Sequence, residues 1–96
     1  MALAVVWSQT ALDDVDGIAA YIFKDSPFYA KAVTEKLLTM AEGVAAFPQI
    51  GRVVPELNQT HIRERFVYSY RLIYEIKPTQ IEGLTVVQGR RLLETD

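Results

Sequence analysis

Residues 8–48 read SQTALDDVDGIAAYIFKDSPFYAKAVTEKLLTMAEGVAAFP, and their apolar side chains recur with the period of an α-helix. In the first part, steps of three and four positions predict an amphipathic helix that runs to about Asp25. Serine is a favoured helix N-cap, so Ser8 marks the start of this helix. The predicted buried stripe consists of Ala11, Leu12, Val15, Ile18, Ala19 and Ile22.

A second helix is predicted to begin at Ser26-Pro27. Serine again provides an N-cap, and proline is tolerated at the first helical position because the amide there has no helical partner. The apolar period continues to Phe47, and Pro48 ends the helix. Two helices of about 18 and 21 residues, joined by so short a connection, are expected to form an antiparallel hairpin.

Extended segments are predicted on both sides of this hairpin. Leu3–Trp7 is a short β-branched and aromatic run that predicts a buried strand. After Pro48 the period becomes strand-like, with runs at residues 53–57, 62–67, 70–77 and 83–88. The gaps between these runs are short, which favours antiparallel hairpin connections. The sequence therefore predicts an α+β fold of order β-α-α-β-β-β(β), with the N-terminal helical hairpin packed on one face of a twisted, mainly antiparallel sheet.

Length and composition limit the other possibilities. Residues 1–96 suit one hydrophobic core, and 50% hydrophobic with 23% charged residues is typical of a globular domain, so a single domain is expected. The chain has no cysteine and one histidine, which argues against common metal sites, and no metal or cofactor is expected. No apolar run approaches the ~18 residues of a membrane span and the N-terminus lacks a basic leader, so a cytoplasmic protein with no membrane partner is expected.

Charge is distributed unevenly along the chain. Residues 1–47 carry a net charge of −3, residues 48–96 carry +1, and all six arginines lie in the second half. A guanidinium group binds phosphate or carboxylate through a planar fork of donors, so this distribution suggests that one part of the molecule meets an anionic partner. The pI near 5.3 argues against a general nucleic-acid-binding protein.

Arg71 is the most informative arginine. Successive residues of a strand point to opposite faces, so Arg71 shares a face with Ile73 and lies opposite the face of Leu72 and Tyr74. If the helices cover the face of Leu72, Arg71 lies on the open side of the sheet.

Two interpretations of the arginines follow from this placement. Arg63 and Arg65 point the same way as each other, and Arg90 and Arg91 follow the last predicted strand, so these groups and Arg71 would form an electropositive groove on the uncovered side of the sheet. Alternatively, each arginine is neutralised by a cross-strand acid such as Glu64 or Glu75. The residues alone leave both interpretations open.

The remaining histidine and tyrosines have simple interpretations. His61 precedes a predicted strand in a polar loop and is interpreted as a surface histidine. Tyr68, Tyr70 and Tyr74 are interpreted as sheet aromatics rather than as a base-stacking surface.

A series of short motifs spans nearly the whole chain. In order they are Trp7-Ser8, Ser26-Pro27, Phe47-Pro48, Gly51-Arg52, Pro55-Glu56-Leu57, Ile62-Arg63-Glu64, Tyr70-Arg71-Leu72-Ile73-Tyr74 and Gly89-Arg90-Arg91. Together with the predicted order of elements, these motifs resemble the RelE/ParE superfamily of bacterial toxins. The resemblance implies the toxin of a type II toxin-antitoxin module, which arrests growth, contributes to plasmid stabilization and is neutralised in a hetero-oligomer with its cognate antitoxin.

The superfamily implies two mechanisms, because ParE-like members inhibit DNA gyrase and RelE-like members cleave mRNA on the ribosome. Nucleolytic relatives hold a phosphate-binding arginine at the position of Arg71, so Arg71, Arg63 and His61 are the candidate catalytic residues of a nuclease. Many relatives have a histidine where this chain has Gln88, which cannot titrate near neutral pH. A C-terminal tyrosine found in some nucleases of the family is also missing. These departures favour gyrase inhibition.

The resemblance also implies which surfaces meet partners. Antitoxins of this kind place a helix in a groove and a strand at a sheet edge. A gyrase inhibitor would use the outer face of the helical hairpin or the tail after Gln88, and a degenerate toxin that only binds its antitoxin is a third alternative. The candidate residues for binding the antitoxin or the target are Arg63, Arg65, Arg71, Arg90 and Arg91.

Overall fold

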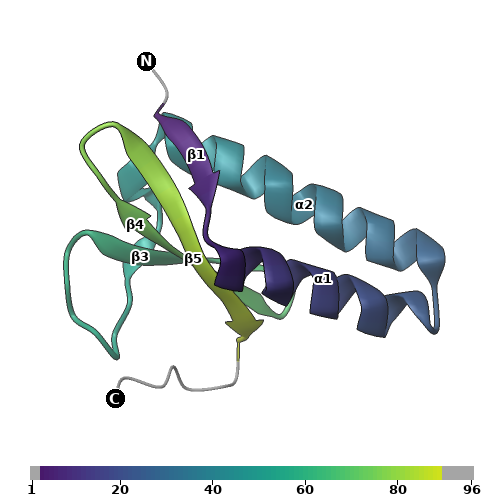
Figure 1. The fold of residues 1–96 in the computed structure, drawn as a ribbon. Helices are drawn as coiled ribbons and strands as arrows, with labels where there is room; N and C mark the ends of the chain where they lie inside the picture. The colour runs from purple at the N-terminus through teal and green to yellow at the C-terminus, as the bar shows by residue number, and fades with distance from the viewer. Residues whose placement is uncertain (1–2, 90–96) are drawn as a thin grey trace.

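A computed structural model describes residues 3–89 as two helices and a five-stranded sheet (Figure 1). The elements in chain order are β1 (Ala4–Trp7), α1 (Gln9–Phe23), α2 (Pro27–Ala46), the short 3-10 helix η1 (Pro48–Ile50), β2 (Arg52–Val53), β3 (Ile62–Val67), β4 (Tyr70–Ile76) and β5 (Gln80–Gln88). This order confirms the predicted α+β fold.

The helices begin where the sequence predicts. The Oγ atom of Ser8 accepts a hydrogen bond from the Ala11 amide at 3.0 Å, and the Oγ atom of Ser26 accepts one from the Tyr29 amide at 3.1 Å. The two helices lie antiparallel (Figure 1), and α1 ends at Phe23, slightly before the predicted end at Asp25. Within residues 3–89, neither helix combines the length and the apolar character that crossing a bilayer requires.

The strands form one mixed sheet in the order β1-β5-β4-β3-β2. β1 is parallel to β5, and the other neighbouring strands are antiparallel. A two-residue turn at Tyr68-Ser69 joins β3 to β4 and places Val67 opposite Tyr70. β1 pairs with only the first part of β5, from Gln80 to Gly83, so within residues 3–89 no strand pairs with the outer edge of β5 beyond Gly83.

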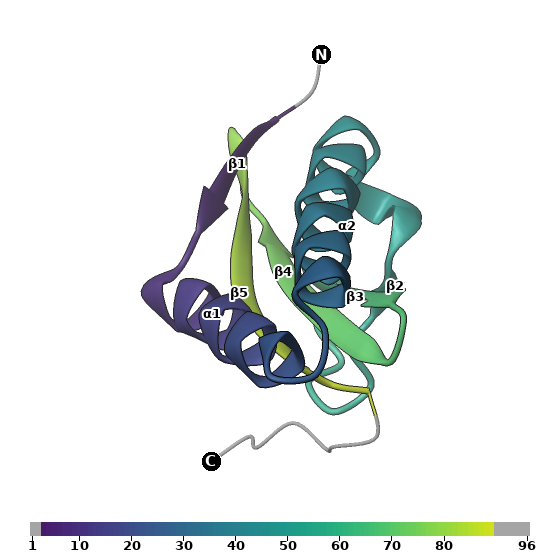
Figure 2. The ribbon, with the colours of Figure 1, turned by 90° about the vertical axis from the view of Figure 1, so that its right-hand side faces the viewer.

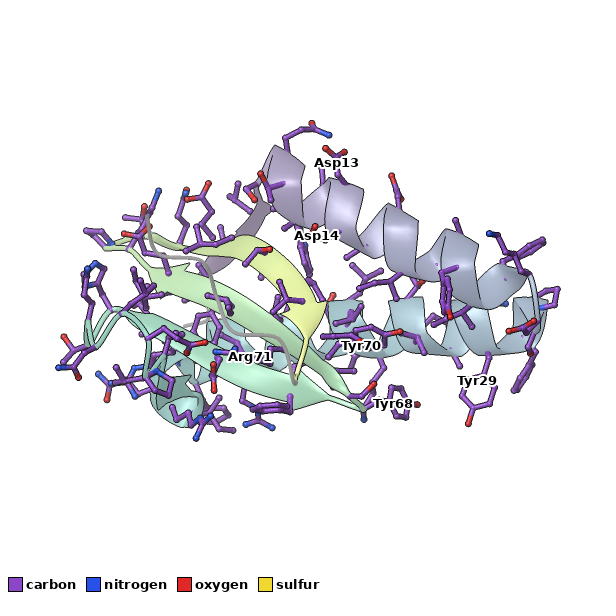
Figure 3. The ribbon with its side chains drawn as sticks, turned by 90° about the horizontal axis from the view of Figure 1, so that it is seen from below. Asp13, Asp14, Tyr29, Tyr68, Tyr70 and Arg71 are labelled. Carbon is purple, nitrogen blue, oxygen red and sulfur yellow. The ribbon has the colours of Figure 1, made fainter. Side chains whose placement is uncertain are left out.

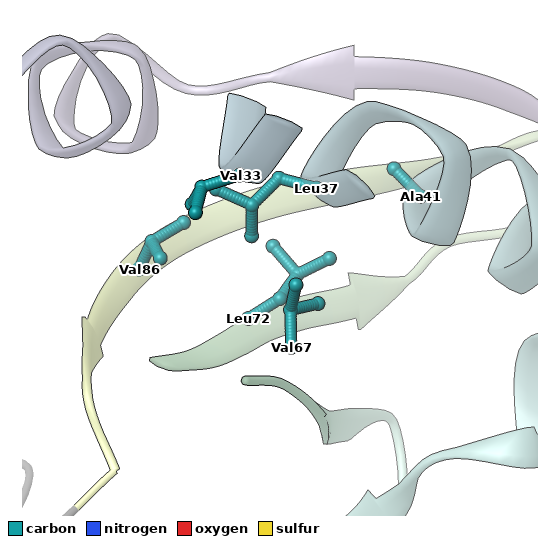
Figure 4. Packing of buried hydrophobic residues seen from close by; sticks show 6 residues of the cluster. All are labelled: Val33, Leu37, Ala41, Val67, Leu72 and Val86. Carbon is teal, nitrogen blue, oxygen red and sulfur yellow. The ribbon is translucent and has the colours of Figure 1, made fainter. Parts of the chain in front are cut away.

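The main core lies between α2 and the sheet. Val33, Leu37 and Ala41 of α2 meet one apolar residue from each of the three central strands, as Figure 4 shows. These strand residues are Val67, Leu72 and Val86. α1 lies beside β5 and α2 beside β3 (Figure 2), so the two helices share the same side of the sheet.

Four further details of the helices and strands differ from the sequence predictions. Leu12 is 44% exposed because the buried stripe of α1 is narrower than predicted. Val6 is 39% exposed because β1 is an edge strand rather than a buried one. The strand predicted at 53–57 ends at Val53, and the chain then turns as the Asn58 amide donates to the Val54 carbonyl oxygen at 2.8 Å. β5 begins at residue 80 rather than 83, because the pairing with β1 extends it.

The three tyrosines predicted to be sheet aromatics occupy different environments. Both Tyr74 and Tyr70 belong to β4; Tyr74 is buried beside Val44 and Ala45 of α2, and Tyr70 is half-buried. Tyr68 lies outside the strands, in the β3–β4 turn, with a positive φ of 53° and an exposed ring. The prediction is therefore wrong for Tyr68, because a two-residue hairpin turn needs a left-handed backbone conformation at this position.

Candidate functional site

Arg71 lies at the centre of a closed cluster of charged side chains on the face of the sheet opposite the helices. It is only 4% exposed. Its Nη1 and Nη2 atoms donate to the two carboxylate oxygens of Glu56, each at 2.9 Å, and its Nε atom donates to Oε1 of Glu64 at 3.0 Å. A planar guanidinium that meets one carboxylate through two parallel bonds is held in a fixed orientation.

Arg52 completes the cluster from the edge of the sheet. Its Nε atom donates to Oε2 of Glu64, the oxygen opposite the one that Arg71 contacts. Its guanidinium carbon lies 5.8 Å from the ring centre of Phe66, within the range of a cation–π contact. Two guanidinium groups thus face the carboxylates of Glu56 and Glu64, and the four formal charges cancel.

The cluster keeps Arg71 positively charged and directs its N–H donors to carboxylates. The hydrogen bonds to Glu56, with further contributions from Glu64, raise the pKa of Arg71 above its ordinary value although burial opposes this. The expectation of an open electropositive groove is wrong at Arg71, because Glu56 and Glu64 cover it. Neutralisation by Glu64 is confirmed, while Glu75, the other acid considered, lies beside His61 instead.

Arg63 and Arg65 lie on the other face of the sheet. Arg63 is opposite Tyr74 and Arg65 is opposite Leu72, two residues that face the helices. The Nε atom of Arg63 donates to the Thr60 carbonyl oxygen at 3.0 Å. The predicted convergence with Arg71 is therefore wrong. The sequence contained the signal: a two-residue turn at 68–69 fixes a register that separates Arg71 from these arginines.

The other candidate residues lie apart from this cluster. His61 is exposed before β3, as predicted, and its Nε2 atom is 3.8 Å from the Glu75 carboxylate. Among the described residues, no contact joins His61 to Arg71. Gln88 ends β5 and is exposed. Arg90 and Arg91 lie outside the described residues.

Tyr74 ties the turn after α2 to the sheet. Its hydroxyl donates to the Pro48 carbonyl oxygen at 2.7 Å and accepts from the Gly51 amide at 3.1 Å. A Cβ atom at Gly51 would lie 2.6 Å from the Glu64 carbonyl oxygen, so only glycine fits this approach. Burial raises the pKa of Tyr74 above its ordinary value of 10.0, although the Gly51 amide opposes the shift.

A groove of about 470 Å³ lies between α1 and the last residues of β5. Asp13 and Asp14 of α1 border it on one side and Tyr70 on the other (Figure 3). Oδ2 of Asp14 accepts hydrogen bonds from Oγ1 of Thr85 at 2.6 Å and from the Val86 amide at 2.9 Å. This contact and that of Glu56 were not predicted from the sequence, because both acids bond to strands distant in sequence and no local pattern indicates the pairing.

The comparison with protein families identifies the chain. The family described as "ParE toxin of type II toxin-antitoxin system, parDE" matches residues 5–93. The chain belongs to the ParE toxin family. This confirms the resemblance to the RelE/ParE superfamily, and the protein is a toxin of a type II toxin-antitoxin system.

Solved structures of related toxins share the fold of this ParE family member. The chromosomal ParDE TA system from P. aeruginosa matches with a TM-score of 0.72 and 16% identity, over 90% of this chain and 95% of that chain. The free E. coli toxin RelE, in a mutant form, has a TM-score of 0.65 and 19% identity, over 94% and 86% of the two chains. The toxin-antitoxin complex RelBE2 from Mycobacterium tuberculosis has a TM-score of 0.60 and 21% identity, over 92% and 99%. No match was found among curated protein sequences.

Proposed function

We propose that this toxin arrests growth by inhibiting DNA gyrase in the cytoplasm and that its cognate antitoxin neutralises it by direct binding. The family match supports the ParE branch of the superfamily. In this proposal the toxin acts as a binding protein, so its effect depends on surface contacts and not on titrating side chains.

The burial and ion pairing of Arg71 are the main support for this proposal. Cleavage of RNA through its 2′-hydroxyl needs a cation for the crowded phosphate, together with an acid and a base. The cation expected at this position is buried, and its donors are directed to Glu56 and Glu64. A phosphate that bound Arg71 would have to displace at least one of these carboxylates and leave it without its partner.

The candidate proton-transfer groups support the same conclusion. His61 contacts Glu75 on β4, and the position at the end of β5 holds Gln88, an amide that carries no exchangeable charge near neutral pH. The described residues thus offer Arg71 two acids as neutralising partners rather than an open phosphate site. Inhibition by binding needs no proton-transfer group, so it fits these residues better than RNA cleavage does.

Two assays on the same purified toxin test the proposal. The first measures supercoiling by DNA gyrase and scores trapped cleavage complexes, and the second measures cleavage of a transcript on programmed ribosomes. We expect loss of supercoiling or linear plasmid, intact transcript, and recovery of gyrase activity when antitoxin is added in excess. Antitoxin recovery is the control for a specific effect.

The opposite results have distinct meanings. A cut transcript with normal gyrase would replace the proposal with a RelE-like endoribonuclease. In that case Arg71→Ala should lower cleavage by about 10² to 10³, as loss of one charge-stabilising donor does. Two inactive assays with intact antitoxin binding would indicate a degenerate toxin that only binds its antitoxin.

A further inference from the structure

A second groove, the outer groove, lies between α1 and α2 where the two helices are connected. Its volume is about 520 Å³. The residues that line it are mostly small or apolar: Ala19, Ala20, Phe23, Pro27, Ala30, Lys31, Thr34 and Glu35. Val33 and Leu37, which meet the sheet, do not line it. The connected ends of the helices extend beyond the sheet (Figure 1), and the large apolar side chain of Phe23 is 60% exposed there.

Two helical stripes continue the outer groove toward the other end of the hairpin. Residues separated by four, seven and eleven positions lie on one face of a helix. The stripes with this spacing are Leu12, Asp16, Ala19 and Phe23 in α1, and Pro27, Lys31, Thr34 and Leu38 in α2. Because Leu12 and Leu38 are both about half exposed, each stripe carries an exposed apolar residue at both ends.

The two stripes are symmetric about the same level of the hairpin. The stripe of α1 is centred between residues 17 and 18, and the stripe of α2 between residues 32 and 33. The helices are antiparallel, and Phe23 and Pro27 line the groove at the connected end, so the two centres lie side by side. A two-fold axis that crosses both helices at this level would place each stripe on a reversed copy of itself.

The apolar residues of the stripes are complementary across this axis. Leu12 of one copy meets Phe23 of the second copy, and Pro27 meets Leu38 in the same way. A two-fold contact forms every such pair twice. The exposed apolar ends of both stripes would therefore be covered by a second copy of this chain.

The charges at the centre are complementary as well. Lys31 of one copy lies near Glu35 of the second copy, and Glu35 near Lys31. Within one chain these side chains make only a loose contact, with 3.9 Å between Nζ and Oε1, and both are exposed. Each is therefore available to pair across the axis, and this charge complementarity favours a second copy as the partner.

We propose that two copies of this toxin associate through their outer grooves, with each helix antiparallel to the same helix of the other copy, so that the two hairpins form a four-helix arrangement. Ala19, Ala20 and Ala30 allow the helices to approach closely. Each helix contributes about three turns, so the interface is small and we expect a dissociation constant of about 1–100 µM. The inference goes beyond the proposed function, because it depends on neither gyrase nor antitoxin.

Sedimentation velocity of purified toxin, from about 1 to about 500 µM, measures the association. The test variants are Lys31→Glu and Phe23→Ser, and the matched controls are Lys36→Glu and Phe47→Ser. Lys36 and Phe47 are exposed and do not line the outer groove. Melting curves confirm that every variant folds.

We expect wild-type toxin to dimerise and Lys31→Glu to weaken the dimer by at least about tenfold, because two like charges then face each other across the axis. Phe23→Ser should weaken it by a similar factor, since it removes buried apolar surface. Combining Lys31→Glu with Glu35→Lys restores opposite charges and should recover most of the affinity. Both controls should dimerise as wild type does.

The absence of cysteine from the sequence allows a direct test of the arrangement. Thr34 lies close to the proposed axis, so Thr34→Cys should form a disulfide between two copies under oxidising conditions. Thr39→Cys is the control, because Thr39 is an exposed residue of α2 that does not line the outer groove. A linked dimer on a non-reducing gel is expected for Thr34→Cys alone.

Several results would overturn the inference. These are a wild-type toxin that stays monomeric over the whole range, an equal loss in Lys31→Glu and Lys36→Glu, and equal cross-linking of the two cysteine variants. If the toxin is monomeric and Phe23→Ser alone loses gyrase inhibition, the outer groove belongs to the target instead. Failure of the gyrase proposal would leave the dimer measurement unaffected, so the two failures are distinguishable.

Discussion

Both faces of the central sheet carry fully buried side chains, but the two faces are buried by different chemistry. On the helix side, Leu72 packs against Leu37 and other apolar residues of α2. On the opposite side, Glu64 and Arg71 are buried by ion pairs that reach Glu56 in the loop after β2. Apolar packing is non-directional and tolerates similar shapes, whereas a buried ion cluster depends on each partner atom.

The difference shows how to interpret a buried arginine in this fold. A buried arginine can serve chemistry or structure, and the acids around it decide which. Here Glu56 reaches Arg71 from outside the regular strands, so the same contacts that neutralise the guanidinium also hold residues 54–61 against the sheet. In this chain the charged face therefore stabilises a loop, while the apolar face stabilises the helices.

The largest expected loss of stability comes from placing a charge at the centre of the apolar face. Leu37 is fully buried, so Leu37→Asp should cost more than about 4 kcal/mol and unfold the domain, because the carboxylate has no partner there. Circular dichroism and a denaturant titration measure the loss. Leu38→Asp is the control, since Leu38 is 48% exposed, and it should change stability by about 0.5 kcal/mol or less. A cooperative, soluble Leu37→Asp variant would contradict the helix orientation.

The charged face is tested by removing one charge without changing shape. Glu64→Gln removes the carboxylate that both Arg52 and Arg71 contact, so it should destabilise the domain by about 3–5 kcal/mol. The matched control is Glu35→Gln, which removes an exposed pair with Lys31 at 3.9 Å and should cost no more than about 0.5 kcal/mol. Equal effects in urea unfolding would show that burial does not strengthen the dependence on Glu64.

Sequence could predict the apolar face because its signals are local. The helical period and the caps at Ser8 and Ser26 determine where the helices begin, and strand alternation assigns Leu72 and Tyr74 to the helix side. The prediction of which side chains of α1 are buried was less accurate, because Leu12 is exposed. Period indicates which face a residue takes, but not how far a neighbouring element covers it.

The charged face and the groove could be predicted only in part. Turn length already determines that Arg63 and Arg65 lie away from Arg71, although the convergence hypothesis overlooked this. The partners Glu56 and Asp14 could not be predicted, because Glu56 precedes Arg71 by 15 residues and Asp14 precedes Val86 by 72. Such contacts depend on how a loop and a helix settle on the sheet, and many acids in the sequence were equivalent candidates for them.

Tyr74 places a hydrogen-bonding hydroxyl on the otherwise apolar face of the sheet. Tyr74→Phe keeps the ring but leaves the Pro48 carbonyl and the Gly51 amide without their bonds, so we expect a loss of about 1–3 kcal/mol at neutral pH. The control is Tyr70→Phe, since Tyr70 is half-buried and its hydroxyl makes no bond to another described residue. Thermal unfolding of both variants measures the difference, and an equal small change would assign no structural role to the Tyr74 hydroxyl.

The smallest expected effect is a dependence of this hydroxyl on alkaline pH. Because burial raises the pKa of Tyr74 above 10.0, the unfolded chain releases the phenolic proton at a lower pH than the folded chain does. The stabilisation is therefore complete below pH 10.0 and declines as the pH rises through the raised pKa of the folded state. Denaturant unfolding of wild type and Tyr74→Phe from pH 8 to about pH 11 should show a difference in stability that is constant at first and then narrows.

The ion pairs of Arg71 provide the control. Arg71 stays charged over this pH range, since its pKa is raised from an ordinary value that is already higher, so the loss of stability in Glu64→Gln should not change with pH. A gap for Tyr74→Phe that widened with pH would show that the tyrosinate, and not the neutral phenol, is the form that the fold stabilises.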